Sequence, residues 1–230
     1  MSFVLKLVDY ENPNSVASLI RRRRLQHLTG LIDEIHARLG SVRIVDLGGR
    51  RDYWNLLEAG YLASRRVEVT LLNFNATQLP GSEECGFIRL TADACAVSDV
   101  ADNAYDLVHS NSTIEHVGNW DRVEAFAAES RRLAPCHFVQ TPYFWFPVEP
   151  HLLMPGFHFL PEGVRAKMLI ANWVRHKALN PDMAYAMRTI QDARLLDRAQ
   201  MRFLYPDSKL KFEWLGPFPK SIIAIRGGSR

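Results

Sequence analysis

The segment from Val42 to Gly49, Val-Arg-Ile-Val-Asp-Leu-Gly-Gly, constrains the fold of this chain more than any other feature of its sequence. Its mostly apolar run is typical of a strand buried on both faces of a parallel sheet. The two glycines predict a tight turn, where backbone amides approach a ligand closely because no Cβ stands in the way. A helix over about residues 53–63 is expected next, from the apolar residues Tyr53, Trp54, Leu56 and Leu57. Such a strand–turn–helix is typical of sites for nucleotide-like ligands, and a purely structural turn is the alternative.

Composition and charge indicate the class of protein. The chain has 230 residues, of which 47% are hydrophobic, and a formal net charge of +3. We therefore expect one folded domain over residues 1–230. The weak net charge gives no reason to expect nucleic acid as a partner. No secretion signal is recognised in residues 1–14 and no apolar run approaches ~20 residues, so we expect a cytoplasmic protein without a membrane span.

Two local features are interpreted as structural. The cluster Arg21–Arg24 is expected to form the solvated face of an N-terminal helix, with binding of phosphate or of an acidic surface as the alternative. The cysteines, Cys85, Cys95 and Cys136, are odd in number and lack metal-ligand spacing. We therefore expect them to be small buried side chains.

Strands and helices alternate through the first two thirds of the chain. Apolar spacing predicts a helix over 15–39 and another over about 120–133, and strands over 42–47, 67–72, 86–90, 105–110 and 136–140. This alternation favours an α/β fold, a doubly wound, mostly parallel sheet with helices on both faces. Residues 42–141 would form the cofactor-binding core.

The pattern changes after Thr141. Prolines and aromatic rings alternate up to Phe159, and two helices are predicted over about 162–178 and 183–197. We interpret residues 142–205 as a cap inserted after strand five to bind substrate. Residues 206–230 would add an antiparallel hairpin, with strands 209–215 and 221–226, to the sheet edge, which makes seven strands. The apolar residues of the first cap helix and its end would close the pocket or form a homodimer contact: Leu169, Ile170, Trp173 and Val174.

Candidate ligand-binding residues follow the strands at successive carboxyl ends, where doubly wound sheets bind ligands. They are Asp46, Gly48, Gly49, Asn73, Phe74, Asp93, Ala94, Ser110, Asn111, Glu115 and His116. In this order these segments resemble the class I S-adenosylmethionine-dependent methyltransferases, in particular the small-molecule, methyltransferase-11-like branch. The segment Tyr105–Val117 is similar to the fourth motif of that branch. The resemblance covers about residues 42–140 and implies a Rossmann-like methyltransferase fold with S-adenosyl-L-methionine as cofactor.

The resemblance implies a role for each strand end. Gly48 and Gly49 would pass beneath the methionine part of the cofactor, and Asp46 would orient that loop or meet the ammonium group through water. Asn73, with Phe74 beside it, would bind the ribose, although the family usually has an acidic residue there and Asn73 is also typical of a turn. Asp93 and Ala94 would contact the adenine ring. Ser110 and Asn111 would lie near the sulfonium. A helix N-cap is the alternative role of Asp93.

Arg50 and Asp52 stand where the family carries further glycines. We expect either that the loop runs differently or that the Arg50 side chain points outward. Together with Asn73, this departure leaves open a scaffold that has lost activity.

Histidines are the expected catalytic residues because their pKa lies near neutrality. His116 is the first candidate for the general base and His109, which is also typical of a core histidine, is the second. Substrate-binding residues are expected in the ring-rich insertion: Tyr143, Trp145, His151 and His158. No metal is predicted, with a divalent site of Glu115, His116, Glu149 and His151 as the alternative.

The function predicted from the sequence is methylation of a small molecule, at a hydroxyl group. A non-catalytic cofactor- or protein-binding module on the same scaffold is the alternative. A nucleic-acid methyltransferase is less favoured. The segment Thr141-Pro142-Tyr143-Phe144 resembles the Asn-Pro-Pro-Tyr motif of methyltransferases that act on bases, but that motif follows strand four and this segment follows strand five. A nicotinamide oxidoreductase is disfavoured by the absence of G-x-G-x-x-G after strand one.

Overall fold

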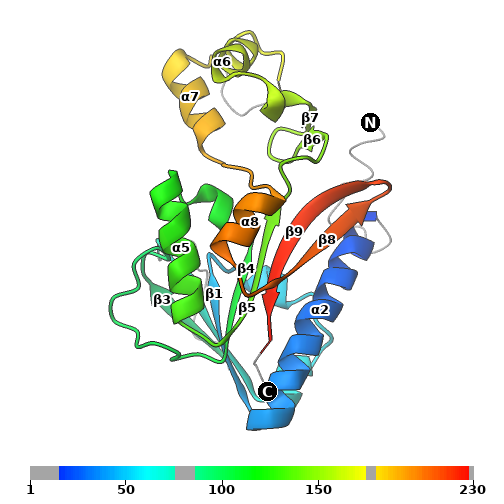
Figure 1. The fold of residues 1–230 in the computed structure, drawn as a ribbon, viewed down its shortest axis with the longest axis vertical. Helices are drawn as coiled ribbons and strands as arrows, with labels where there is room; N and C mark the ends of the chain where they lie inside the picture. The colour runs from blue at the N-terminus through cyan, green and yellow to red at the C-terminus, as the bar shows by residue number, and fades with distance from the viewer. Residues whose placement is uncertain (1–15, 76–85, 175–179, 228–230) are drawn as a thin grey trace.

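The computed structural model describes residues 16–75, 86–174 and 180–227, with side chains from residue 24 onward. A seven-stranded sheet with the order β3-β2-β1-β4-β5-β9-β8 forms its centre (Figure 1). Its strands are β1 (Val42–Leu47), β2 (Val67–Asn73), β3 (Phe87–Thr91), β4 (Leu107–Asn111), β5 (Cys136–Pro142), β8 (Lys209–Leu215) and β9 (Phe218–Arg226). The first five are parallel, and β9 runs antiparallel to β5 and β8. The predicted mostly parallel sheet with a C-terminal hairpin is confirmed.

Helices cover both faces of the sheet because alternate strand residues point to opposite sides. Val42 and Ile44 of β1 share a core with α2 (Val16–Leu39), while Val45 and Leu47 share the other core with α5 (Trp120–Arg132). Both cores are fully buried, which explains the near-continuous apolar character of β1.

The cap stands at one end of the sheet, at the top of Figure 1. It contains β6 (Val148–Glu149), β7 (Met154–Pro155), η3 (Phe157–Phe159), α6 (Glu162–Ile170) and α7 (Met183–Gln191). Phe157, Leu169 and Ile190 bury a small core of its own. The cap therefore packs around its own side chains and meets the sheet through its two connecting segments, where Tyr143 and Leu196 form a parallel bridge.

The helix predicted over 53–63 is wrong. The chain instead forms two single turns, α3 (Arg51–Trp54) and α4 (Tyr61–Ser64). Gly60, with φ +79°, takes the left-handed conformation that an α-helix cannot include. The apolar residues do mark a buried face, since Trp54 is buried, but a turn of the chain interrupts the helix that their spacing predicts.

The cap helices are also shorter than predicted. The first ends at Ile170, shortly before Asn172 takes a φ of +56°, and residues 175–178 of the prediction lie outside the described residues. The second ends at Gln191. A further helix, α8 (Arg198–Leu204), begins at Asp197, whose side chain forms a capping box with Gln200. This unpredicted helix packs on the sheet through Met201 and Leu204.

Cys95 and Cys136 are buried, as expected, and Cys85 lies outside the described residues. Within the described ranges, no helix combines the length and apolar character needed to cross a lipid bilayer.

Candidate functional site

A cavity of 740 Å³ lies between the sheet and the cap. Asp46 and Gly48 at the end of β1 and Asn111 at the end of β4 border it on the sheet side. Strand order reverses between β1 and β4, and doubly wound folds bind their ligands at such a switch point. Pro150 and His151 of the cap border the opposite side. The cavity therefore occupies the place where this architecture favours a ligand.

Asp46 is the anchor of the sheet side. Its Oδ2 accepts a hydrogen bond from the Trp54 indole at 2.8 Å, and its Oδ1 lies 2.7 Å from Nδ1 of His109. The carboxyl group also lies directly under the glycine turn, since a Cβ on Gly49 would approach Cγ of Asp46 to 2.2 Å. Gly48 takes a φ of +72° and donates to the carbonyl of Leu72. Asp46 thus orients the glycine turn by packing beneath Gly49, and its hydrogen bonds to Trp54 and His109 hold the carboxyl group in place.

His109 borders the cavity although its side chain is fully buried. Its ring contacts those of Tyr53, Trp54 and Phe138, with centroids 4.7, 5.1 and 5.8 Å away. Its Nε2 has no hydrogen-bond partner among the described residues. The ring is therefore held in one orientation, with one nitrogen unused by the protein.

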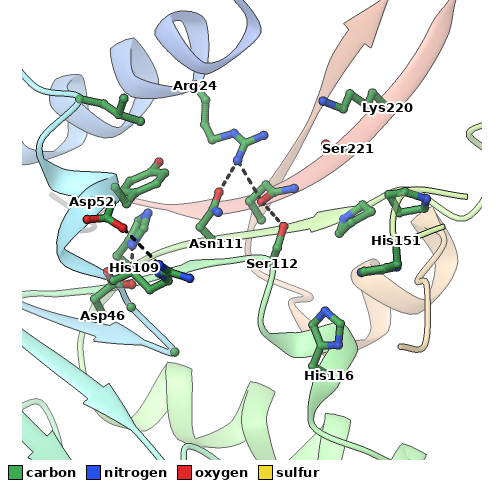
Figure 2. A pocket seen from close by; sticks show the side chains of 18 of the residues that line it. Arg24, Asp46, Asp52, His109, Asn111, Ser112, His116, His151, Lys220 and Ser221 are labelled. Atoms are coloured by element: carbon green, nitrogen blue, oxygen red, sulfur yellow. Dashed lines mark hydrogen bonds and ion pairs between the residues drawn. The ribbon is translucent and has the colours of Figure 1, made fainter. Parts of the chain in front are cut away.

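Arg24 is not part of a solvated helix face, contrary to the prediction. Its guanidinium is buried, binds Glu213 through two contacts of 2.7 and 2.6 Å, and also donates to Asn111 and Gln140. It lines the cavity (Figure 2). Helical spacing places it on the face of Leu28, one turn further on, and this signal in the sequence was overlooked.

His116 and His151 stand at the cap side of the cavity, apart from Asp46 and His109 (Figure 2). His116 ends η2 (Ile114–His116), and its ring centroid lies 4.9 Å from that of His151. Nδ1 of His116 contacts the main-chain oxygen of Asp192 at 3.1 Å and its carboxylate at 3.3 Å.

Two carboxylates accompany these rings. Glu115 is 1% exposed and accepts a hydrogen bond from the Thr141 hydroxyl at 3.0 Å. Burial raises the pKa of its carboxyl group against the opposing effect of the nearby histidines. Glu149 lies 2.7 Å from Nδ1 of His151. Burial is the largest single effect and acts to lower the pKa of His151, but the hydrogen bond to Glu149 and the negative charges of Glu149, Glu115 and Asp192 together outweigh it, so the pKa is raised.

Three residues expected to bind the cofactor do not border the cavity. Asn73 is buried and donates to the carbonyl of Gly49 at 2.9 Å, so it supports the glycine turn. Ser110 is fully buried and donates to the carbonyl of Leu47 at 3.1 Å. Phe74 is 78% exposed. The polar groups of Asn73 and Ser110 are thus engaged with the main chain of the β1 segment.

The expected adenine residues form a separate local structure. Asp93 binds the Arg122 guanidinium through both oxygens, at 2.9 and 3.0 Å, and accepts a hydrogen bond from the Cys95 amide. The bond to Arg122 lowers the pKa of Asp93. Ala94 packs against the core beside α5. Neither Asp93 nor Ala94 borders the cavity.

The ring-rich insertion contributes to the cavity in part. Tyr143 lines it, whereas Trp145 is 58% exposed and borders a separate shallow groove. Nε2 of His158 contacts the carbonyl of Phe144 at 2.8 Å, away from the cavity. Of the four predicted substrate-binding residues, the structure brings Tyr143 and His151 to the cavity.

Arg50 points outward. Its side chain is 76% exposed and pairs with Asp52 at 3.2 Å at the rim of the cavity. The glycine turn therefore accommodates an arginine at this position with most of its side chain in solvent.

Sequence reasoning missed five polar residues of the cavity wall: Arg24, Ser112, Gln140, Lys220 and Ser221. Ser112 and Gln140 share a hydrogen bond of 3.1 Å between β4 and β5. Lys220 lies on β9, whose insertion beside β5 carries it there. Strand order decides its place, and no local signal in the sequence indicates it.

No protein-family model and no curated protein matches the chain. A solved structure described as a SAM dependent methyltransferase from Archaeoglobus fulgidus aligns with 90% of this chain and 93% of its own, with a TM-score of 0.52 and 12% sequence identity. The chain has the class I methyltransferase fold. A second solved structure, described as putative Zn-dependent alcohol dehydrogenases from Rhodobacter sphaeroides, aligns with 83% of this chain and 85% of its own, with a TM-score of 0.50 and 10% identity. At these identities the likeness concerns the fold alone.

The cavity can be compared with the S-adenosylmethionine site that the sequence resemblance leads us to expect. The glycine turn presents main chain at the cavity wall, and Asn111 and Ser112 add polar groups beside it. The adenosyl part finds fewer prepared groups, because Asn73 and Asp93 are already bonded within the protein.

Proposed function

We propose that this protein transfers a methyl group from S-adenosylmethionine to a hydroxyl group of a small molecule. One observation carries the proposal: a single cavity is bordered by the glycine turn on the sheet side and by His116 and His151 on the cap side. Its position at the strand-order reversal of a class I methyltransferase fold supports the cofactor. Its cover by the cap favours an acceptor small enough to enter beneath it.

Residues on the two sides of the cavity would have different roles. When bound, the cofactor supplies an electrophilic methyl group on its sulfonium. Gly48, Gly49 and Asn111 would hold its methionine part, and Tyr143 and Phe146 would exclude water from the acceptor. Holding the acceptor oxygen in line supplies much of the rate.

His116 would take the acceptor proton. Its imidazole would accept the hydroxyl proton as the acceptor oxygen takes up the methyl group that the cofactor supplies. The side chain of His116 is 34% exposed, so it can release this proton to solvent after turnover.

Calorimetry with S-adenosylmethionine tests the proposal. We expect micromolar binding by the native chain and about tenfold weaker binding by Asn111→Ala, because that change removes one hydrogen-bonding group from the cavity wall. Asn55→Ala is the matched control, since Asn55 is exposed and does not border the cavity. Absence of binding at millimolar cofactor would overturn the proposal in favour of a non-catalytic module.

A further inference from the structure

Glu115, His116 and His151 gather three metal-ligating groups at the cap side of the cavity. One donor atom from each residue lies within 4.8 Å of the donor atoms of the other two. Zinc–nitrogen bonds measure about 2.0–2.1 Å. The three donor atoms therefore need to move only a little closer together to bind one cation. The side chains of His116 and His151 are 34% and 32% exposed, so a metal ion from solvent can reach both.

The hydrogen bonds around the two rings fit metal ligation. Nδ1 of His151 is bound to the carboxylate of Glu149, and Nδ1 of His116 faces the main-chain oxygen and carboxylate of Asp192. Histidines that ligate metals almost always give their second nitrogen to a carboxylate or carbonyl, which fixes the ring and its tautomer. This arrangement leaves Nε2 of each ring as the ligand atom.

Glu115 supplies the third ligand and an independent reason to expect a cation. It is 1% exposed, and its Oε1 has no hydrogen-bond partner among the described residues. Its other oxygen accepts the bond from Thr141, which orients the carboxyl group. A buried polar atom without a partner costs free energy that a bound cation would remove.

We propose that Glu115, His116 and His151 bind a divalent transition-metal cation. Two imidazoles and one carboxylate are the ligand set of several catalytic zinc and iron(II) sites, in which the remaining coordination positions stay open. Mg²⁺ and Ca²⁺ prefer oxygen ligands and fit this set less well. Both rings border the cavity, so a cation held by them would be accessible from it.

The cation gives the proposed methyl transfer a means of binding the acceptor, and this part of the inference rests on the proposed function. An acceptor hydroxyl on an open position would be oriented toward the glycine turn and made more acidic by the cation. With the cation bound, His116 would serve as a ligand instead of the proton acceptor described above, and the acceptor proton would leave to solvent. Metal binding itself does not depend on any methyl transfer.

Metal titration of the chelator-treated full chain tests the inference. With ZnCl₂ in calorimetry and CoCl₂ in visible absorption, we expect one equivalent to bind at micromolar or lower concentration, with the absorption bands of cobalt bound by nitrogen and oxygen. MgCl₂ should bind at least tenfold more weakly. Glu115→Gln, His116→Asn and His151→Asn should each weaken Zn²⁺ binding by tenfold or more, and Glu149→Gln by less than these.

The matched control is His27→Asn, because His27 is an exposed histidine of α2 outside the cavity. It should bind Zn²⁺ like the native chain. Circular dichroism establishes that each variant is folded, and Glu115→Gln retains the size of the buried side chain if a histidine variant fails to fold. Failure of the native chain to bind Zn²⁺ and Co²⁺, or undiminished binding by the folded ligand variants, would overturn the inference.

The two proposals fail separately. Loss of S-adenosylmethionine binding with intact Zn²⁺ binding would overturn the proposed function and leave the metal site in place. Micromolar cofactor binding without metal binding would overturn the metal site alone.

Discussion

The two sides of the cavity hold their histidines in opposite ways. On the sheet side, His109 is fully buried, bound to Asp46 and enclosed by aromatic rings. On the cap side, His116 and His151 are about one third exposed and lie on short connecting segments. The strand β4 holds its histidine rigidly, whereas η2 and the cap each contribute one partly exposed histidine. A histidine that borders a cavity is therefore structural or chemical according to what surrounds it.

The largest effect is expected from His116→Ala. Removing the imidazole should lower turnover by about 10²–10⁴-fold, because it removes the proton acceptor or a metal ligand beside the acceptor. Cofactor affinity should stay the same, since the side chain lies on the cap side. Single-turnover kinetics and calorimetry measure the two quantities. Unchanged turnover would remove His116 from the mechanism and erase the contrast between the two sides.

Asp46→Ala should affect stability rather than chemistry. It leaves the Trp54 indole and the His109 ring without their buried partner, which should cost about 3 kcal/mol in the free energy of unfolding. Urea unfolding measures this. Asp52→Ala is the control, because its carboxylate is 77% exposed and should contribute little. Equal effects of the two variants would mean that Asp46 is not the anchor of the sheet side.

The free energy of unfolding should decrease at acidic pH because of a buried histidine in the sheet. Burial lowers the pKa of His137 on β5 to about 3. Below its ordinary pKa of 6.5 the unfolded chain gains a proton there that the folded chain does not, so stability falls as the pH drops from 6.5 toward 3. The contribution is about 1.4 kcal/mol per pH unit within that window.

His137→Phe should remove this contribution while keeping a ring against Tyr205. Urea unfolding at pH 7, 6 and 5 compares the two chains. Parallel pH profiles would show that the buried histidine of the sheet does not control acid stability.

The smallest effects are expected at helix caps. Asp182 caps α7 in the cap, and Asp197 caps α8 on the sheet. Each substitution by Ala should cost about 1 kcal/mol. Hydrogen exchange should show faster local exchange in α7 for Asp182→Ala, because the cap packs around its own core, and global destabilisation for Asp197→Ala. Global destabilisation by both would show that the cap and the sheet unfold as one unit.

Much of the fold is readable from local patterns. The apolar run of β1, the glycine turn and the terminal hairpin appear where the sequence predicts them, because each depends on neighbouring residues. The helix expected over 53–63 did not form, since a left-handed glycine interrupts its apolar spacing. Asp197 was assigned to the end of one helix, whereas its carboxylate starts the next.

The candidate site was less predictable. Asn73, Asp93 and Ser110 carry suitable groups at the expected strand ends, but the structure bonds those groups to Gly49, Arg122 and Leu47. Which partner a polar side chain meets depends on packing between elements, and strand position alone does not decide it.

The sequence by itself determined the alternation of strands and helices, the glycine turn and the class of fold, because periodicity and turn chemistry act over a few residues. Only the tertiary structure decided that Arg24 is buried, that Lys220 borders the cavity and that His116 meets His151. These contacts join residues far apart in the chain. They form because the order of the strands and the packing of the cap bring them together.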